Sequence, residues 1–175
     1  DQVSPKKCGH TPGKHVIGRE DARMKIRAAV EAARDNDILV LARTDARAVV
    51  NFDEALTRCA MFVEEGADII FLEAPESVDE MRAFCAAIPK PCMANMVFGG
   101  KTPVLPPREL EAIGYKIALY PLVLLSAAVK AMEQALLALK PAALGPMPPA
   151  ASFDELKAVV GFPDYWAQER RFAAE

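Results

Sequence analysis

The chain has 175 residues, of which 52% are hydrophobic and 26% are charged, and its formal net charge is −3. This composition excludes a disordered chain. Because the basic residues are scattered, it also excludes a basic patch for nucleic acid or for an anionic membrane surface. We therefore expect one soluble globular chain with a sizeable core and a small-molecule partner.

The sequence contains few features that indicate a cellular compartment. The longest nearly apolar run, residues 117–129, contains Pro121 and is too short to span a bilayer. No signal peptide is visible. The four cysteines show neither CxxC spacing nor a metal-ligand rhythm with the two histidines, which predicts free thiols and a reducing, cytoplasmic setting.

Short apolar runs alternate with helical patterns along the chain. After a leading loop and helix, four runs predict buried strands at residues 38–42, 69–72, 92–94 and 116–120. Strands that alternate with helices are typical of a parallel sheet.

Patterns typical of helices lie between the predicted strands. Asp53 is the expected N-cap of a helix that ends at Gly66, and Ser77 with Glu80 fits the capping-box pattern of the next helix. The following helix is expected to begin after the pair Pro106 and Pro107 and to end near Gly114. A longer helix then carries an apolar stripe of Leu122, Leu125, Val129, Met132, Leu136 and Leu139.

Two architectures fit this order, an open doubly wound sheet and part of a (β/α)₈ barrel. Polar groups follow three of the runs, at Arg43, Glu73 and Asn95, and barrel enzymes place their catalytic groups at these strand ends. No glycine-rich nucleotide motif follows a strand, which weakens the open-sheet alternative.

A complete barrel needs about 250 residues. We therefore predict an α/β fold with a partial TIM barrel of about four parallel strands. The predicted divisions are the second half of a barrel at 1–140, a Pro-rich linker at 141–152 and a C-terminal helical segment at 153–175.

Six segments carry a family resemblance: DQVSPKKCGH, LARTDA, FLEAPES, ANMVFGGKTP, ALYP and SFDELKAVVGFPDYW. In this order they resemble the second half of the isocitrate lyase and phosphoenolpyruvate mutase superfamily, closest to methylisocitrate lyase and 2,3-dimethylmalate lyase. The resemblance implies a carbon–carbon lyase that uses Mg²⁺ or Mn²⁺. Its reaction would be retro-aldol cleavage of a 2-hydroxy di- or tricarboxylate to a 2-oxo acid, pyruvate, and a dicarboxylate.

The resemblance assigns roles within SPKKCGH. Such cleavage leaves a carbanion next to a carboxylate, and a thiol tuned by neighbouring cations can protonate it. Cys8 would be the general acid, Lys6 would assist it, and Gly9 and His10 would touch the substrate. Glycine would also let the loop close and exclude water. Mutase members carry a different motif here, so the thiol favours carbon–carbon cleavage; the alternative is an inert surface thiol.

Strand ends supply the other candidates. Arg43 would hold a substrate carboxylate with its planar fork, or form only a surface ion pair with Asp45. Glu73 would complete the catalytic set as an acceptor for substrate hydroxyl or carboxylate groups, or be a structural carboxylate. Asn95 would donate to a substrate carboxylate, or satisfy a turn. Three further residues would shape an apolar pocket wall, with core packing as the alternative: Phe71, Leu119 and Pro121.

Two departures from the family pattern matter. The carboxylates that hold the metal in the family lie on earlier strands and at the end of the fourth strand, just before the position of Asp1. We therefore expect no metal site in this chain and no turnover by it alone. Phe98 stands where relatives carry Glu, which leaves the acid that is cleaved open.

A half barrel exposes two strand edges and an apolar face. We therefore expect a fragment of a larger protein, or a chain that another copy covers. The resemblance implies a homo-oligomer, a dimer or tetramer, that exchanges a C-terminal helix anchored by Tyr165 and Trp166. Alternative functions are an oxaloacetate- or dimethylmalate-acting enzyme, a phosphonomutase-like relative, and a catalytically inactive half barrel with an assembly role.

Overall fold

The computed structural model describes residues 1–9, 11–140 and 146–173. The chain forms two compact units, Asp1–Leu124 and Leu125–Glu175. The predicted divisions at residues 140 and 152 stay a prediction, and part of the predicted linker, residues 141–145, lies outside the described residues.

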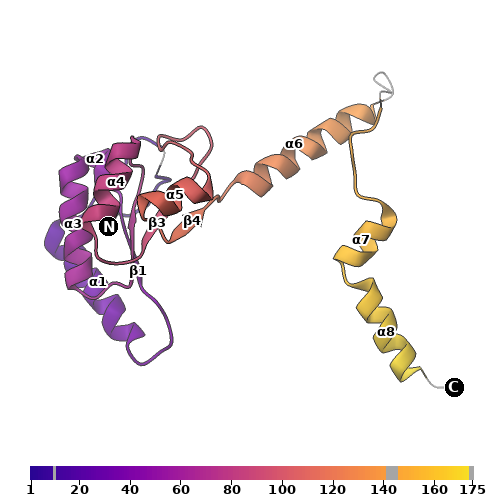
Figure 1. The fold of residues 1–175 in the computed structure, drawn as a ribbon, viewed down its shortest axis with the longest axis horizontal. Coiled ribbons are helices and arrows are strands. Elements are labelled where there is room, and N and C mark those ends of the chain that lie inside the picture. Colours follow the sequence, from indigo (N-terminus) through magenta and orange to yellow (C-terminus); the bar gives the residue numbers. More distant parts are fainter. Residues whose placement is uncertain (10, 141–145, 174–175) are drawn as a thin grey trace. The chain divides into compact units, whose positions relative to one another are not determined.

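A four-stranded parallel sheet organises the first unit (Figure 1). Its strands follow chain order and are β1 (Leu41–Thr44), β2 (Ile69–Leu72), β3 (Cys92–Asn95) and β4 (Ile117–Leu119). Parallel strands joined by helices are buried on both faces, which is why short apolar runs suffice to form them. The arrangement confirms the predicted partial barrel.

The first strand corrects one prediction. It begins at Leu41 rather than at residue 38, and Ile38 and Leu39 are 65% and 70% exposed. The ladder starts where β2 offers a partner, because Leu41 pairs with Ile69 in the register. Arg43 therefore lies inside the strand rather than after it.

Helices α1 (Arg19–Ala33), α2 (Ala46–Val49), α3 (Phe52–Glu64), α4 (Val78–Ala87) and α5 (Pro107–Ile113) accompany the sheet (Figure 1). Among them, α3 packs against β1 and β2, and neighbouring contacts link α1 to α3, α3 to α4 and α4 to α5. The predicted end at Gly114 is confirmed; its φ of 123° is one that glycine adopts readily.

Helix caps differ from the prediction in two places. Asn51, not Asp53, caps α3, and its side chain accepts a hydrogen bond from the amide of Glu54. Ser77 caps α4 as predicted, but the Glu80 carboxylate accepts from the amide of Glu76 and pairs with Arg47. A charged partner from another element thus replaces half of the expected capping box.

The two faces of the sheet carry different kinds of side chain. Side chains alternate along a strand, so residues two apart share a face. Ala42, Ile70, Leu72 and Ala94 belong to the core cluster that packs with the helices. The opposite face carries Arg43 beside its register partner Phe71, and Asn95 beside Leu119.

The second unit contains most of α6 (Val123–Ala138), together with α7 (Phe153–Val159) and α8 (Phe162–Phe172). Ser152 and Glu155 form a complete capping box at α7, and Gly161 in the left-handed region separates α7 from α8. None of these three helices buries a residue within the described part of the chain. Nor does any described helix combine the length and apolar character needed to cross a membrane.

Candidate functional site

One cavity collects most of the predicted site residues. It has a volume of about 770 Å³ and lies where β1, β2 and β3 end. Parallel strands bring their carboxyl ends to one edge of a sheet, so residues far apart in sequence meet there. The predicted residues in its wall are Lys6, Cys8, Gly9, Arg43, Glu73, Asn95 and Pro121.

Charge in the cavity favours an anionic ligand. The wall carries more cationic side chains than carboxylates, and a concave surface with an excess of one sign concentrates ligands of the other sign. The cations are Lys6, Lys7, Lys25 and Arg43, and the carboxylates are Asp1, Asp45 and Glu73.

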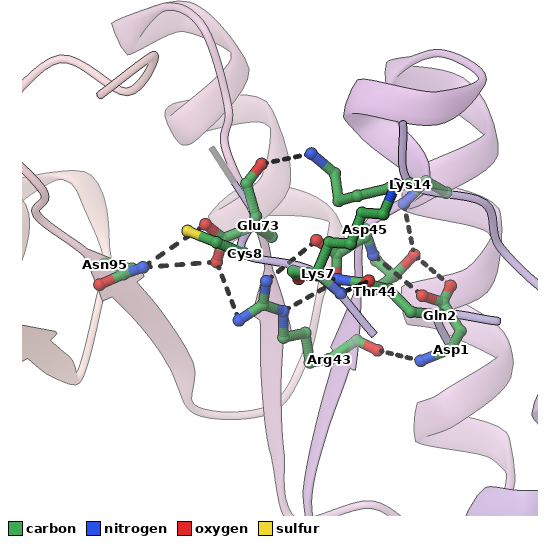
Figure 2. Close-up of polar contacts among 12 residues, drawn as sticks. Asp1, Gln2, Lys7, Cys8, Lys14, Arg43, Thr44, Asp45, Glu73 and Asn95 are labelled. Atoms are coloured by element: carbon green, nitrogen blue, oxygen red, sulfur yellow. Dashed lines mark hydrogen bonds and ion pairs between the residues drawn. The ribbon is translucent and has the colours of Figure 1, made fainter. Parts of the chain in front are cut away.

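Arg43 is held on three sides (Figure 2). Its Nε and Nη2 donate to the Asp45 carboxylate at 2.8 and 2.9 Å, and Nη1 lies 3.5 Å from Glu73. The guanidinium carbon stands 5.1 Å from the centroid of the Phe71 ring. Although burial opposes its charge, the hydrogen bonds to Asp45 and the charge of Glu73 raise the pKa of Arg43. The ion pair with Asp45 therefore exists, and it fixes a permanent cation in the cavity wall.

Glu73 and Asn95 form the next part of the wall. The Glu73 side chain is 1% exposed, and the Asn95 Nδ2 lies 3.4 and 3.5 Å from its carboxylate oxygens. The Asn95 Oδ1 is buried and lacks a hydrogen-bond partner among the described residues. Since an unsatisfied buried acceptor is costly, a ligand hydroxyl that donates to this oxygen would be favoured.

The backbone beside Glu73 is unusual. Ala74, the residue that follows it, is buried and has a φ of 56°, in the left-handed region that residues with a Cβ rarely adopt. Such conformations cluster at functional sites, where the surrounding structure maintains them.

A buried network behind Arg43 was missed by sequence reasoning. The Asp1 carboxylate accepts hydrogen bonds from the Thr44 hydroxyl at 2.7 Å, the Asp45 amide at 3.0 Å and the Arg58 Nη1 at 3.2 Å. Arg58 is 4% exposed and lies in the middle of α3. The network fixes Asp45, which in turn orients Arg43. Asp1 and Thr44 belong to the quoted motifs, but no local pattern marks Arg58.

The loop around Cys8 lies against this wall. Cys8 and Lys6 are exposed and contribute to the cavity, whereas Gly9 is buried. A Cβ on Gly9 would stand 2.3 Å from the Glu73 Oε1, so only glycine fits. Lack of space for a Cβ beside Glu73 explains glycine here, and the predicted role of Gly9 in loop closure stays a prediction.

Some predicted residues lie elsewhere. Phe71 and Leu119 are outside the described set that lines the cavity; Phe71 lies under Arg43, and Leu119 is 43% exposed at the end of β4. Their role as pocket walls stays a prediction. His10 lies outside the described residues. Phe98 is 64% exposed and is also absent from the described lining.

The remaining cysteines are free, as Cys8 is. Burial raises the pKa of the Cys59 thiol. A hydrogen bond with Cys92, together with burial, raises the pKa of Cys85. Both thiols are therefore held in the neutral form, which favours their predicted structural role.

The carboxylates near the cavity do not fit a divalent cation. Among the described residues, no group of three or more His, Cys, Asp or Glu side chains could hold a metal ion. Asp45 and Glu73 are each paired with Arg43, and Asp1 is paired with Arg58. Carboxylates neutralised by guanidinium groups are poor ligands for Mg²⁺.

Relatives of known activity match most of the chain. It is 42% identical over 175 residues to 2,3-dimethylmalate lyase of Eubacterium barkeri, covering 99% of this chain and 61% of that protein. It is 48% identical over 136 residues to 2-methylisocitrate lyase of Aeropyrum pernix, covering 78% of this chain and 44% of that protein. The chain thus spans about half the length of these relatives.

Solved structures share the fold. Oxaloacetate acetylhydrolase with the inhibitor 3,3-difluorooxalacetate superposes with a TM-score of 0.89 at 31% identity, covering 100% of this chain and 60% of that one. Phosphonopyruvate hydrolase with oxalate and Mg²⁺ superposes with a TM-score of 0.73 at 26% identity, covering 98% and 60%.

The family model described as phosphoenolpyruvate phosphomutase matches residues 2–140. These residues hold the whole sheet and, apart from Asp1, every described residue of the cavity wall. Together with the lyase relatives, this match establishes that the chain belongs to the phosphoenolpyruvate phosphomutase family, within the superfamily shared with isocitrate lyase.

Proposed function

We propose that this chain forms the acid and substrate-binding part of a carbon–carbon lyase of the methylisocitrate lyase type. Its substrate would be a 2-hydroxy tricarboxylate, cleaved to pyruvate and a dicarboxylate, or a 2-hydroxy dicarboxylate, cleaved to pyruvate and a monocarboxylate. The observation that carries the proposal is the single cavity shared by a thiol, a fixed guanidinium and an unsatisfied amide, namely Cys8, Arg43 and Asn95.

Binding follows from the cations of the wall. Arg43 is oriented by Asp45 before any ligand arrives, and a guanidinium has five donors, so capacity remains for a substrate carboxylate. The Asn95 Oδ1, which lacks a partner among the described residues, would accept a hydrogen bond from the substrate hydroxyl. Lys6 and Lys7 add positive charge on the loop side of the cavity.

Cleavage requires two proton movements. The hydroxyl proton would pass to the Glu73 carboxylate as the hydroxyl-bearing carbon becomes a carbonyl. The electron pair of the broken bond would remain on the neighbouring carbon, next to a carboxylate. Cys8 would then donate its proton to that carbon, which completes the second carboxylic acid and prevents recombination.

The binding and proton-transfer steps proposed above use only residues of this chain and do not include a metal. The described residues do not fit Mg²⁺. Under this proposal the ion, Mg²⁺ or Mn²⁺, would be held by protein other than the described residues, and the chain alone would not turn over substrate.

An alternative substrate has a specific basis. The structural similarity to oxaloacetate acetylhydrolase includes the whole chain at a TM-score of 0.89. Oxaloacetate is also a small dicarboxylate that suits a cationic cavity. An enzyme of that kind would release oxalate and acetate rather than pyruvate.

The test is a substrate panel on the protein encoded by the whole reading frame. Methylisocitrate, dimethylmalate and oxaloacetate would be incubated with Mg²⁺, and the products identified by mass spectrometry. We expect pyruvate from one of the methyl-bearing acids and a roughly 10²–10⁴-fold loss of kcat in Cys8→Ala, with KM little changed. Turnover that survives Cys8→Ala, or oxalate as the only product, would contradict the proposal.

A further inference from the structure

Polar groups hold the backbone on both sides of Cys8. We call residues 4–9 the cysteine loop. Gln2 is 6% exposed, and its carboxamide makes two hydrogen bonds with the backbone of Lys7: the Lys7 amide donates to Oε1 at 2.8 Å, and Nε2 donates to the Lys7 carbonyl at 2.9 Å. This two-point contact fixes the residue immediately before Cys8.

Lys14 holds Gly9, the residue immediately after Cys8. Its ammonium donates to the carbonyl of Gly9 at 2.5 Å and to that of Thr11 at 2.8 Å. Thr11 in turn donates to the Cys8 carbonyl from its amide at 3.1 Å and from its hydroxyl at 2.9 Å. Figure 2 shows the Lys14 side chain extending toward Cys8 and Glu73 from the same side as Gln2.

The base of the loop is also closed. The Val3 amide donates to the His15 carbonyl at 2.8 Å, the Ile17 amide donates to the Asp1 carbonyl at 2.9 Å, and Gln2 bridges to Val16. Residues 1–3 and 15–17 thus lie side by side, as in compact surface loops whose ends are close.

Gly9 allows the cysteine loop to pack directly against Glu73. A Cβ at this position would overlap the Glu73 side chain, so the glycine lets the main chain approach Glu73 closely. The main chain of Cys8 and of both its neighbours is therefore fixed, while the thiol side chain is left in the cavity wall.

We propose that Gln2 and Lys14 are positioning residues that hold the cysteine loop so that the Cys8 thiol faces Glu73 and Arg43. The importance of this position for catalysis rests on the function proposed above. The hold on the loop does not, because it follows from the hydrogen bonds alone. A proton donor must be aligned with the reacting carbon, and loosening its backbone lowers the rate of proton transfer.

The test is amide hydrogen exchange of this chain, followed by mass spectrometry of peptides from residues 3–14. Gln2→Met removes both contacts with Lys7, and Lys14→Met removes both contacts with the carbonyls. Each is expected to speed exchange at least tenfold within this segment and to leave the strands unchanged. The matched controls are Gln168→Met and Lys130→Met, two exposed positions on α8 and α6, which should leave the segment unchanged.

Gln2→Glu separates positioning from general packing. At neutral pH its carboxylate can accept from the Lys7 amide but cannot donate to the Lys7 carbonyl. Protonation restores a donor, so protection of the segment in Gln2→Glu should recover as the pH falls through about 4. Gln2→Met should show no recovery. Segment exchange that is unchanged in both Met variants, or that rises equally throughout the first unit, would overturn the proposal.

The rate of acid cleavage by the protein encoded by the whole reading frame provides a second measurement. A loosened loop should lower kcat at least tenfold and leave KM nearly unchanged, because Arg43 and Asn95 still bind the acid. Unchanged kcat with a loosened loop would overturn the positioning role. A loop-confined increase in exchange without cleavage of any acid would instead refute the proposed function and establish the hold on the loop.

Discussion

The two units of this protein bury their apolar side chains to very different extents. In the first unit, Phe62 and Phe84 are fully buried within a contiguous core between helices and sheet. In the second unit, Leu125, Leu136 and Val159 are 61%, 65% and 82% exposed, and no described helix there buries a residue.

The difference shows what helix signals can and cannot achieve. The second unit has well-formed local features, including a complete capping box at Ser152 and an aromatic pair of Phe162 and Trp166 with ring centroids 5.4 Å apart. Caps and pairs define where helices begin, but a core requires a second layer. We propose that another copy of the chain covers this unit, in line with the predicted homo-oligomer and helix exchange.

Truncating one phenylalanine in each unit tests this difference in burial most directly. Phe62→Ala should lower the free energy of unfolding by about 3–5 kcal/mol, because it leaves a cavity in the core. Phe172→Ala, at a position that is 74% exposed, should change it by no more than about 0.5 kcal/mol. Chemical denaturation measures both values, and equal losses would refute the contrast.

A second change tests how tightly the first unit is packed at its cavity. Gly9→Ala would place a methyl group against Glu73 and should displace the cysteine loop at a cost of about 1–3 kcal/mol. Tryptic cleavage after Lys6 and Lys7 should therefore rise at least tenfold. Gly18→Ala is the control, since the nearest atom would be 3.6 Å away. Equal cleavage rates in the two variants would show that the loop does not depend on this contact.

The third prediction concerns self-association of the chain through the exposed apolar side chains of the second unit. Leu136→Asp introduces a charge on the apolar stripe of α6 and should weaken self-association at least tenfold, which is about 1.4 kcal/mol. Gln134→Asp adds the same charge at an exposed polar position of the same helix and should have little effect. Sedimentation velocity measures the association. A parent chain that remains monomeric at all concentrations would contradict the proposed cover.

The smallest expected effect is a pH dependence in the first unit. The hydrogen bond from Arg19, opposed by burial and helped by Arg58, lowers the pKa of Glu54 from 4.5 to about 2. Because the folded pKa lies below the unfolded one, Glu54 contributes stability above pH 4.5 and loses it as the pH falls toward 2. Glu54→Gln should flatten the decline of Tm in this window.

The matched control for that measurement lies in the second unit. Glu169→Gln, at an exposed position of α8, should retain the decline of the parent chain. A Glu54→Gln variant with an unchanged pH dependence of Tm would show that its ion pairs with Arg19 and Arg58 contribute nothing to stability.

Much of the fold could be read from local patterns. Apolar runs located three of the four strands within one residue at each end, and Ser77, Gly114 and Ser152 mark helix ends as their residue types indicate. These signals are local, since a cap or a buried run needs only its immediate neighbours to be recognised.

Other features depended on distant partners. Ile38 and Leu39 are as apolar as Leu41, yet the strand excludes them because its ladder begins opposite Ile69. Glu80 leaves the capping box because Arg47, from another helix, is close enough to bind it. Neither partner can be identified from the pattern around the residue itself.

Local sequence patterns were enough to define the strand and helix order, the parallel sheet and the residue types at the strand ends, because hydrophobic periodicity and caps act over a few residues. Tertiary structure decided which of those residues meet: that Asp45 orients Arg43, that Asp1 and Arg58 support Asp45 from behind, and that Gln2 and Lys14 hold the cysteine loop. Hydrogen bonds between groups far apart in the chain form only where the fold brings donor and acceptor within about 3 Å, and no short segment encodes that distance.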